Sequence, residues 1–120
     1  HLSLGQKARM QQIDFLTDLV RSYEHVVLMG DMNCPEDSPE IRQLKSSTGL
    51  MSSGCPRPSY PSWNPTRRID HILVSPSIAI EETRVLNHAF SDHLPVAMTI
   101  SLPECFELDD NVQPGCRSAA

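Results

Sequence analysis

The sequence of 120 residues lacks several features that would quickly assign a protein to a class. No apolar run approaches the roughly 18 residues that a membrane-spanning helix needs, so we expect no membrane span. The amino terminus shows no charged-then-apolar pattern typical of a secretory signal. Lys and Arg number 10 against 15 Asp and Glu, and the net charge of −5 argues against a broad basic surface that binds nucleic acid non-specifically.

Recognisable cysteine and glycine motifs are also missing from the sequence. The four cysteines are separated too widely for a zinc finger or a CxxC redox motif, and no glycine-rich phosphate-binding loop is present. A chain of this length with a normal apolar content does not need disulfides to be stable. We therefore predict that the protein is cytoplasmic and that its four cysteines are reduced. They are Cys34, Cys55, Cys105 and Cys116.

What is present indicates one α/β domain over residues 1–102, followed by an acidic tail at 103–120 without periodicity, which we expect to be disordered. Apolar residues at helical spacing predict a helix over 6–23, with Met10, Ile13, Leu16, Leu19 and Val20 on one face. The run 26–29 predicts a strand buried on both faces. A second helix is predicted to begin at Pro39, with Ser38 as its cap and Ile41 and Leu44 facing inward, and to end at Lys45 or Ser46. A loop over 46–67 follows it. The predicted strands after this loop cover 68–75, 78–86 and 96–100.

Three polar clusters adjoin the ends of predicted strands, and each allows two interpretations. Asp31 and Asn33, two residues apart, can project into one cleft, or they can simply form an Asx-turn. Asp70 lies within an apolar alternation and needs a partner, either a histidine or the neighbouring Arg67 or Arg68. Asp92 and His93 offer a cation ligand next to a base, or a capped turn with an exposed ring.

Taken together and in order, these clusters resemble a known family. Gly30-Asp31-Met32-Asn33, Arg68-Ile69-Asp70-His71-Ile72 and Ser91-Asp92-His93-Leu94-Pro95 resemble the carboxyl-terminal half of the endonuclease/exonuclease/phosphatase superfamily, the metal-dependent phosphoesterases related to deoxyribonuclease I. The opening His1-Leu2 is similar to the family's Thr-His-Leu segment. The resemblance implies half of a four-layer α/β/β/α sandwich.

The resemblance also implies roles for individual residues. Asp31 and Asn33 would orient the attacking water and the phosphoryl oxygens, and Asp92 would bind Mg²⁺ together with them, with Mn²⁺ or Ca²⁺ as alternatives. His93 would act as base, with its ring held by Asp70, and His1 would lie near the scissile phosphate. The residues that would flank the substrate are Tyr60, Trp63 and Arg68, although Trp63 could instead pack under the proline-rich loop.

The family's other half supplies an Asn and a Glu that this sequence does not match, so we expect a partial site that is weakly active or inactive without a missing amino-terminal half or a second copy. The expected function is hydrolysis of a phosphate ester, with DNA as the less favoured substrate because of the net charge of −5. The alternative is a non-catalytic remnant that binds a partner protein. A zinc or disulfide module is excluded by the cysteine spacing.

Overall fold

The computed structural model describes residues 1–54 and 57–104. Within these ranges Cys34 is a buried free thiol. The other three cysteines and nearly all of the predicted tail at 103–120 lie outside the described residues. None of the described helices is long and apolar enough to cross a membrane.

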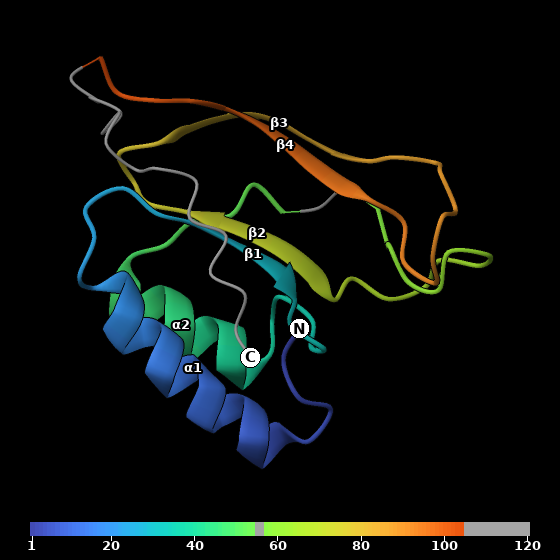
Figure 1. Cartoon of the computed structure of the whole chain (residues 1–120), viewed down its shortest axis with the longest axis horizontal. Helices are drawn as coiled ribbons and strands as arrows, with labels where there is room; N and C mark the ends of the chain where they lie inside the picture. The colour runs from blue at the N-terminus through green and yellow to red at the C-terminus, as the bar shows by residue number, and fades with distance from the viewer. Residues whose placement is uncertain (55–56, 105–120) are drawn as a thin grey trace, which may run out of the picture.

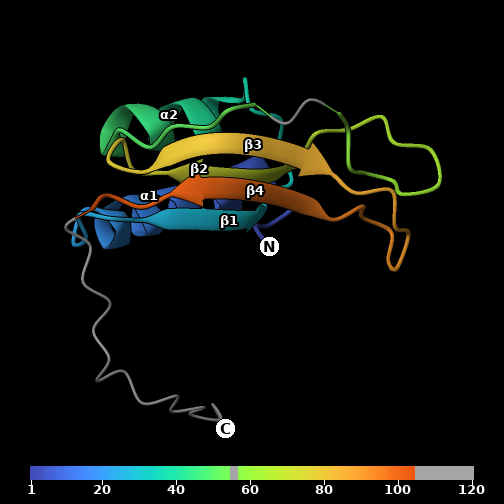
Figure 2. The same cartoon turned by 90° about the horizontal axis from the view of Figure 1, so that it is seen from above.

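Two helices and four strands form the described part of the chain in three layers. The β1–β2 sheet lies between the helices on one side and the β3–β4 sheet on the other (Figures 1 and 2), and both sheets are antiparallel pairs. This arrangement confirms the α/β class and the half-sandwich. In chain order the elements are α1 (Gln6–Val20), β1 (Val27–Asp31), α2 (Pro39–Thr48), β2 (Asp70–Val74), β3 (Ala79–Val85) and β4 (Val96–Ser101).

The two helices differ from their predicted lengths at their carboxyl ends. Helix α1 stops at Val20 instead of residue 23, since the residues that follow are exposed and have no apolar packing to extend the helix. Helix α2 starts as predicted, with the Ser38 hydroxyl accepting from the Ile41 amide, but it continues to Thr48. It ends where Gly49 adopts a left-handed conformation at φ 74°, a position that favours glycine.

The core lies between the helices and the β1–β2 sheet. Ile13 of α1 is fully buried, as are Ile41 and Leu44 of α2, which confirms their predicted inward orientation. Leu73 of β2 is also fully buried and belongs to the same cluster. Leu19, predicted on the apolar face of α1, is 47% exposed, so that face is narrower than its spacing indicated.

The prediction that the run 26–29 is buried on both faces is wrong. Met29 is 64% exposed and Val27 37% exposed. Val27 and Met29 point to the same face of β1 because side chains alternate along a strand, and the described part of the second sheet packs against β2 through β4 and not against β1. One face of β1 is therefore only partly covered among the described residues.

Candidate active site

The register of the β1–β2 sheet brings two of the polar clusters together. The strands run antiparallel, and Asp31 at the carboxyl end of β1 lies opposite Asp70 at the start of β2. Directly opposite residues of an antiparallel pair have their side chains about 5 Å apart on the same face. Two carboxylates 39 positions apart in the sequence therefore share one site. The strand alternation directs His71 to the other face, where it is hydrogen-bonded to the Cys34 carbonyl.

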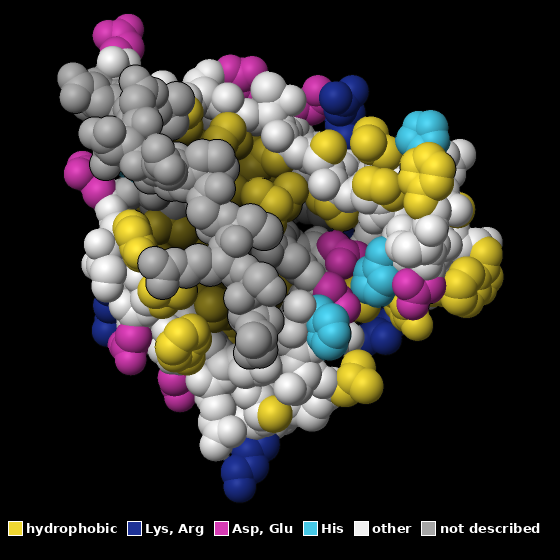
Figure 3. Space-filling view, viewed as in Figure 1, with side chains coloured by type: hydrophobic (Ala, Val, Ile, Leu, Met, Phe, Trp, Pro, Cys, Tyr) yellow, Lys and Arg dark blue, Asp and Glu magenta, His cyan; other side chains and the backbone are white. Residues whose placement is uncertain are grey.

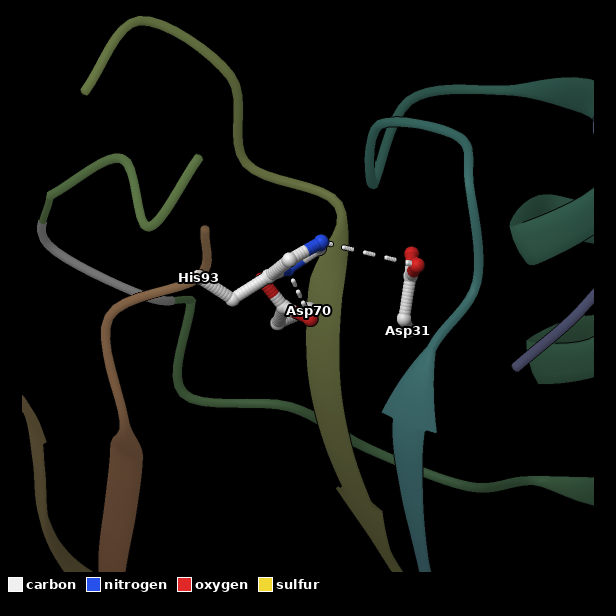
Figure 4. Close-up of side chains that lie close together, drawn as sticks. All are labelled: Asp31, Asp70 and His93. Atoms are coloured by element: carbon white, nitrogen blue, oxygen red, sulfur yellow. Dashed lines mark hydrogen bonds and ion pairs between the residues drawn. The ribbon is translucent and has the colours of Figure 1, made fainter. Parts of the chain in front are cut away.

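His93 joins this pair from the segment that precedes β4. Its Nδ1 lies 2.8 Å from Asp70 Oδ2 and 3.0 Å from Asp70 Oδ1, and its Nε2 lies 3.9 Å from Asp31 Oδ2. Figure 4 shows the imidazole between the two carboxylates. The Asp70 contact decides the ambiguity left by the sequence, because this carboxylate is paired with a histidine. A ring that donates Nδ1–H to Asp70 keeps Nε2 available toward Asp31.

The electrostatics of the site favour the protonated imidazole. Desolvation by itself lowers the pKa of His93, but the hydrogen bond to Asp70 and the negative charges of Asp70, Asp31 and Asp92 outweigh it, so the pKa is raised above the ordinary value of 6.5. The ring is therefore a stronger base than a free imidazole.

A second group of contacts, made by the segment around Ser59 and Tyr60, holds the Asp70–His93 pair in place. The Ser59 hydroxyl, almost fully buried, donates to Asp70 Oδ2, and the Leu94 amide donates to the Ser59 carbonyl over 2.8 Å. The Tyr60 ring packs against the His93 ring with centroids 4.7 Å apart, and the Arg67 guanidinium lies 5.7 Å above the Tyr60 ring. These contacts hold the carboxylate and the imidazole in one orientation.

His93 and its two carboxylate partners, with Tyr60 and Arg67, line an open cavity of about 550 Å³, a size typical of small-molecule sites. Acidic and histidine side chains gather on this part of the surface in Figure 3. Of the described residues proposed from the sequence, Arg68 and Trp63 are exposed and do not line it. Trp63 is 74% exposed, so it does not pack under the proline-rich loop either. The predicted site residues that line the cavity are His1, Asp31, Asn33, Asp70, Asp92 and His93, with Tyr60 beside them.

Asn33 satisfies both interpretations of its motif. Its backbone amide donates to Asp31 Oδ1 over 2.8 Å, which is an Asx-turn, and its positive φ of 52° suits an asparagine. Its side-chain amide donates to the Leu2 carbonyl over 2.6 Å, while the Leu2 amide donates to the Asp31 carbonyl over 2.8 Å. The turn thus fixes the amino-terminal segment, with His1, at the edge of the cavity.

Comparison with known proteins agrees with this geometry. Residues 3–93 match the model of the Endonuclease/Exonuclease/phosphatase family. The chain belongs to this family. Its members are hydrolases, and the match includes the first two motifs and Ser91-Asp92-His93 of the third. A search of curated protein sequences found no match.

Several solved structures share the fold of this chain. A conserved protein of unknown function from Enterococcus faecalis V583 aligns with a TM-score of 0.70 at 21% identity, covering 86% of this chain and 48% of that one. A mannosyl-6-phosphatase from Bacteroides thetaiotaomicron VPI-5482 aligns with a TM-score of 0.67 at 25% identity, covering 82% and 47%. A family protein from Bacteroides thetaiotaomicron gives 0.69 at 22% identity, covering 82% and 46%. The chain therefore spans just under half the length of these structures.

Sequence reasoning missed Ser59, and it considered Arg67 as a candidate partner of Asp70 or as part of a basic groove, not as a neighbour of Tyr60. Ser59 lies in a stretch rich in Ser and Pro, where a single hydroxyl carries no recognisable pattern. The signal that could have pointed to this segment is Tyr60, an aromatic residue directly before a proline and close to the second motif. Its contact with His93 depends on a loop path that periodicity does not predict.

Proposed function

We propose that this chain is part of a metal-dependent phosphoesterase that cleaves its substrate by in-line attack of water. The observation that carries the proposal is the placement of His93 between the carboxylates of Asp70 and Asp31 at the edge of an open cavity. An imidazole held at one nitrogen by a carboxylate, with the other nitrogen facing the cavity, is the arrangement of a general base.

Each residue has a proposed task in this reaction. His93 Nε2 takes a proton from the attacking water or stabilises the crowded phosphorus centre, while Asp70 keeps the ring in the tautomer with Nδ1–H. Asp31 orients the water, and Asn33 contributes to holding it or the phosphoryl oxygens. His1, at the edge of the same cavity, assists the leaving group. Because the pKa of His93 is raised, the neutral ring that base catalysis needs forms only at a pH higher than for an ordinary imidazole.

The group of described residues that could hold a divalent cation differs from the ligand set expected from the sequence. Ligand atoms of Asp31, Asp70 and His93 all lie within 4.8 Å of one another, whereas Asp92 lines the same cavity outside this group. Since Asp70 and His93 are engaged with each other, we assign Asp31 and Asp92, with Asn33, as the ligands of Mg²⁺, for which carboxylate and amide oxygens are suitable. Mn²⁺ and Ca²⁺ are the alternatives. A bound cation supplies charge stabilisation to the non-bridging and leaving oxygens.

The favoured substrate is a small phosphate ester or a phosphorylated headgroup. The net charge of −5 disfavours a long polyanion, and one structure that shares the fold is named a mannosyl-6-phosphatase. Nucleic acid is the second candidate because Arg67 lines the cavity and Arg68 is exposed next to it in the sequence. A remnant that only binds a protein is disfavoured, since the acidic, amide and imidazole residues of the motifs are all present.

We further propose that full turnover needs residues beyond these 120, because the chain spans 46–48% of the matched structures and holds no counterpart of the family's first Asn and Glu motifs. The missing amino-terminal half, or a second copy of the chain, would supply them.

The experiment compares hydrolysis of bis(p-nitrophenyl) phosphate and p-nitrophenyl phosphate by the chain alone and by the chain joined to the amino-terminal half of a family member. We expect Mg²⁺-dependent turnover in the joined protein and little in the chain alone. A folded joined protein without turnover contradicts the phosphoesterase proposal, whereas full turnover by the chain alone contradicts the need for further residues. Gel shifts at increasing salt test the nucleic-acid alternative.

A further inference from the structure

Strand β2 begins with two polar side chains in succession, and they point to opposite faces of the β1–β2 sheet. Asp70 pairs with His93 at the cavity. His71 shares the other face with Leu73, which belongs to the core beneath the helices. The His71 side chain is buried there at 6% exposure, and no step of the proposed reaction uses it. A buried polar ring is normally retained for the hydrogen bond that it makes, so that bond indicates what His71 does.

The hydrogen bond of His71 goes to a backbone carbonyl. Its Nε2 lies 2.8 Å from the Cys34 carbonyl oxygen. Because a carbonyl oxygen can only accept, Nε2 carries a proton and donates it. Cys34 is 2% exposed, so its carbonyl is shielded from water and needs a donor within the protein. His71 supplies that donor.

The carbonyl that His71 holds directly follows Asn33, which has a positive φ of 52°. A residue other than glycine keeps this conformation only where its surroundings fix the backbone on both sides. Before Asn33, the Met32 amide donates to the Ile69 carbonyl over 2.8 Å, and Asp31 Oδ1 accepts the Asn33 amide over 2.8 Å. After Asn33, the bond from His71 fixes the chain.

From these contacts we propose that His71 is a positioning residue of the candidate site, which holds the Cys34 carbonyl and thereby directs Asp31 and Asn33 toward the cavity. Strand β2 then sets both sides of the site, because Asp70 orients the imidazole of His93 and His71 orients the loop that faces it. The inference rests on the proposed function for the tasks of Asp31 and Asn33. The two bonded groups are already buried by residues of this chain, so the contact does not depend on what else adjoins the cavity.

A histidine that only fills the core would behave differently. Its replacement would destabilise the whole sheet and leave the backbone at Asn33 as it is. Loss of a positioning residue changes the loop while the sheet stays folded. Amide hydrogen exchange separates the two cases, since it reports local opening and global unfolding at individual residues.

The experiment compares three variants of the 120-residue chain. His71→Met keeps an apolar side chain of similar size but has no donor. His71→Gln restores an N–H donor at a similar reach along the side chain. The control is Leu73→Val, which removes one buried methylene from the same face of β2 and no hydrogen bond.

Exchange of the Asn33 amide, measured by NMR, is the main readout. In His71→Met it should become about tenfold faster, the effect of losing one hydrogen bond, and this factor should exceed that for the amides of the β1–β2 ladder. His71→Gln should recover most of the protection, and Leu73→Val should affect the ladder at least as much as Asn33. An Asn33 amide that is unchanged in His71→Met, not recovered in His71→Gln, or equally affected in Leu73→Val overturns the inference.

A measurement on the unaltered chain decides the case in which a variant does not fold. The nitrogen resonances of the His71 ring show which nitrogen carries the proton. The contact with the Cys34 carbonyl requires a proton on Nε2. A ring protonated at Nδ1 alone overturns the inference.

Binding of Mn²⁺ separates this inference from the proposed function. With Asp31 and Asn33 among the ligands, His71→Met should weaken Mn²⁺ binding to the chain about tenfold and His71→Gln should restore it, because groups that orient ligands typically change metal affinity by about 10–100-fold. A chain that binds no Mn²⁺ contradicts the proposed metal site, and the Asn33 amide still decides the role of His71. Equal affinity in the native chain and in His71→Met overturns the inference and leaves the proposed function standing.

Discussion

Replacing Arg9 with Met should leave a buried carboxylate without its cation. Arg9 Nε and Nη2 both lie 2.8 Å from Glu40 Oε1, and the two side chains are only 12% and 1% exposed. Arg9 also donates to the carbonyls of Ser3 and Leu4, so the same side chain ties the two helices to the segment that carries His1. The variant therefore tests both the packing of the helices and the anchoring of the site's amino-terminal edge.

The size of the expected loss in stability follows from the burial of Glu40 and Arg9. Removing one partner of a buried ion pair costs about 3–5 kcal/mol, because the remaining charge stays desolvated. In the native chain, burial raises the pKa of Glu40, but a backbone hydrogen bond and Arg9 outweigh it, so the pKa is lowered. The ionised carboxylate therefore contributes stability that is fully present above the ordinary pKa of 4.5. That contribution is lost as the pH falls through the lowered pKa of Glu40 in the folded chain. In the Arg9→Met variant the backbone hydrogen bond and the contact with Ser38 still oppose burial, but the cation is lost, so the pKa of Glu40 rises relative to the native chain and acidification relieves part of the penalty.

The assay is urea unfolding followed by circular dichroism. With an m-value of about 2 kcal/mol/M, the midpoint should fall by about 2 M near neutral pH and by clearly less near pH ~4. The matched control is Arg84→Met, since Arg84 and Glu82 form a pair 3.5 Å apart with side chains 58% and 55% exposed, and its loss should cost about 0–1 kcal/mol. The double variant Arg9→Met/Glu40→Met should recover most of the stability. Equal costs for Arg9→Met and Arg84→Met, or a cost independent of pH, would refute the reasoning.

Four further outcomes test the site and the fold. His93→Ala should lower kcat of the joined two-half protein by about 10²–10⁴-fold with an unchanged circular dichroism spectrum; near-native kcat would reject the role. Asp70→Asn should lower the pKa of His93 in an NMR titration. In the native chain the charged ring provides stability that is fully present below its ordinary pKa and is lost as the pH rises through the raised pKa of the folded chain, and the variant should lose part of it. Asp92→Asn should weaken Mn²⁺ binding in a calorimetric titration, and an unchanged affinity would remove it from the ligand set. Ser38→Ala should cost about 1 kcal/mol in urea unfolding, since it removes the cap of α2.

Local patterns predicted most elements of the fold. Ser38 followed by Pro39 marks a helix start through short-range hydrogen bonding and a fixed proline φ, and the structure has the helix there. Alternation over 68–75 predicted β2 within two residues at its start. The errors lie at element ends and at one face of β1, because helix length and strand burial depend on which neighbours pack against the element.

For the site, the amino-acid sequence by itself determined which side chains are available: the carboxylates, the amide and the imidazoles occur in an ordered set of motifs that indicates phosphoester chemistry. Only the tertiary structure decided how they meet. The antiparallel register sets Asp31 opposite Asp70, and the loop contacts of Ser59 and Tyr60 turn His93 toward both. Register and loop path arise from contacts between residues far apart in the chain, whereas sequence patterns report only neighbours within a turn or a strand.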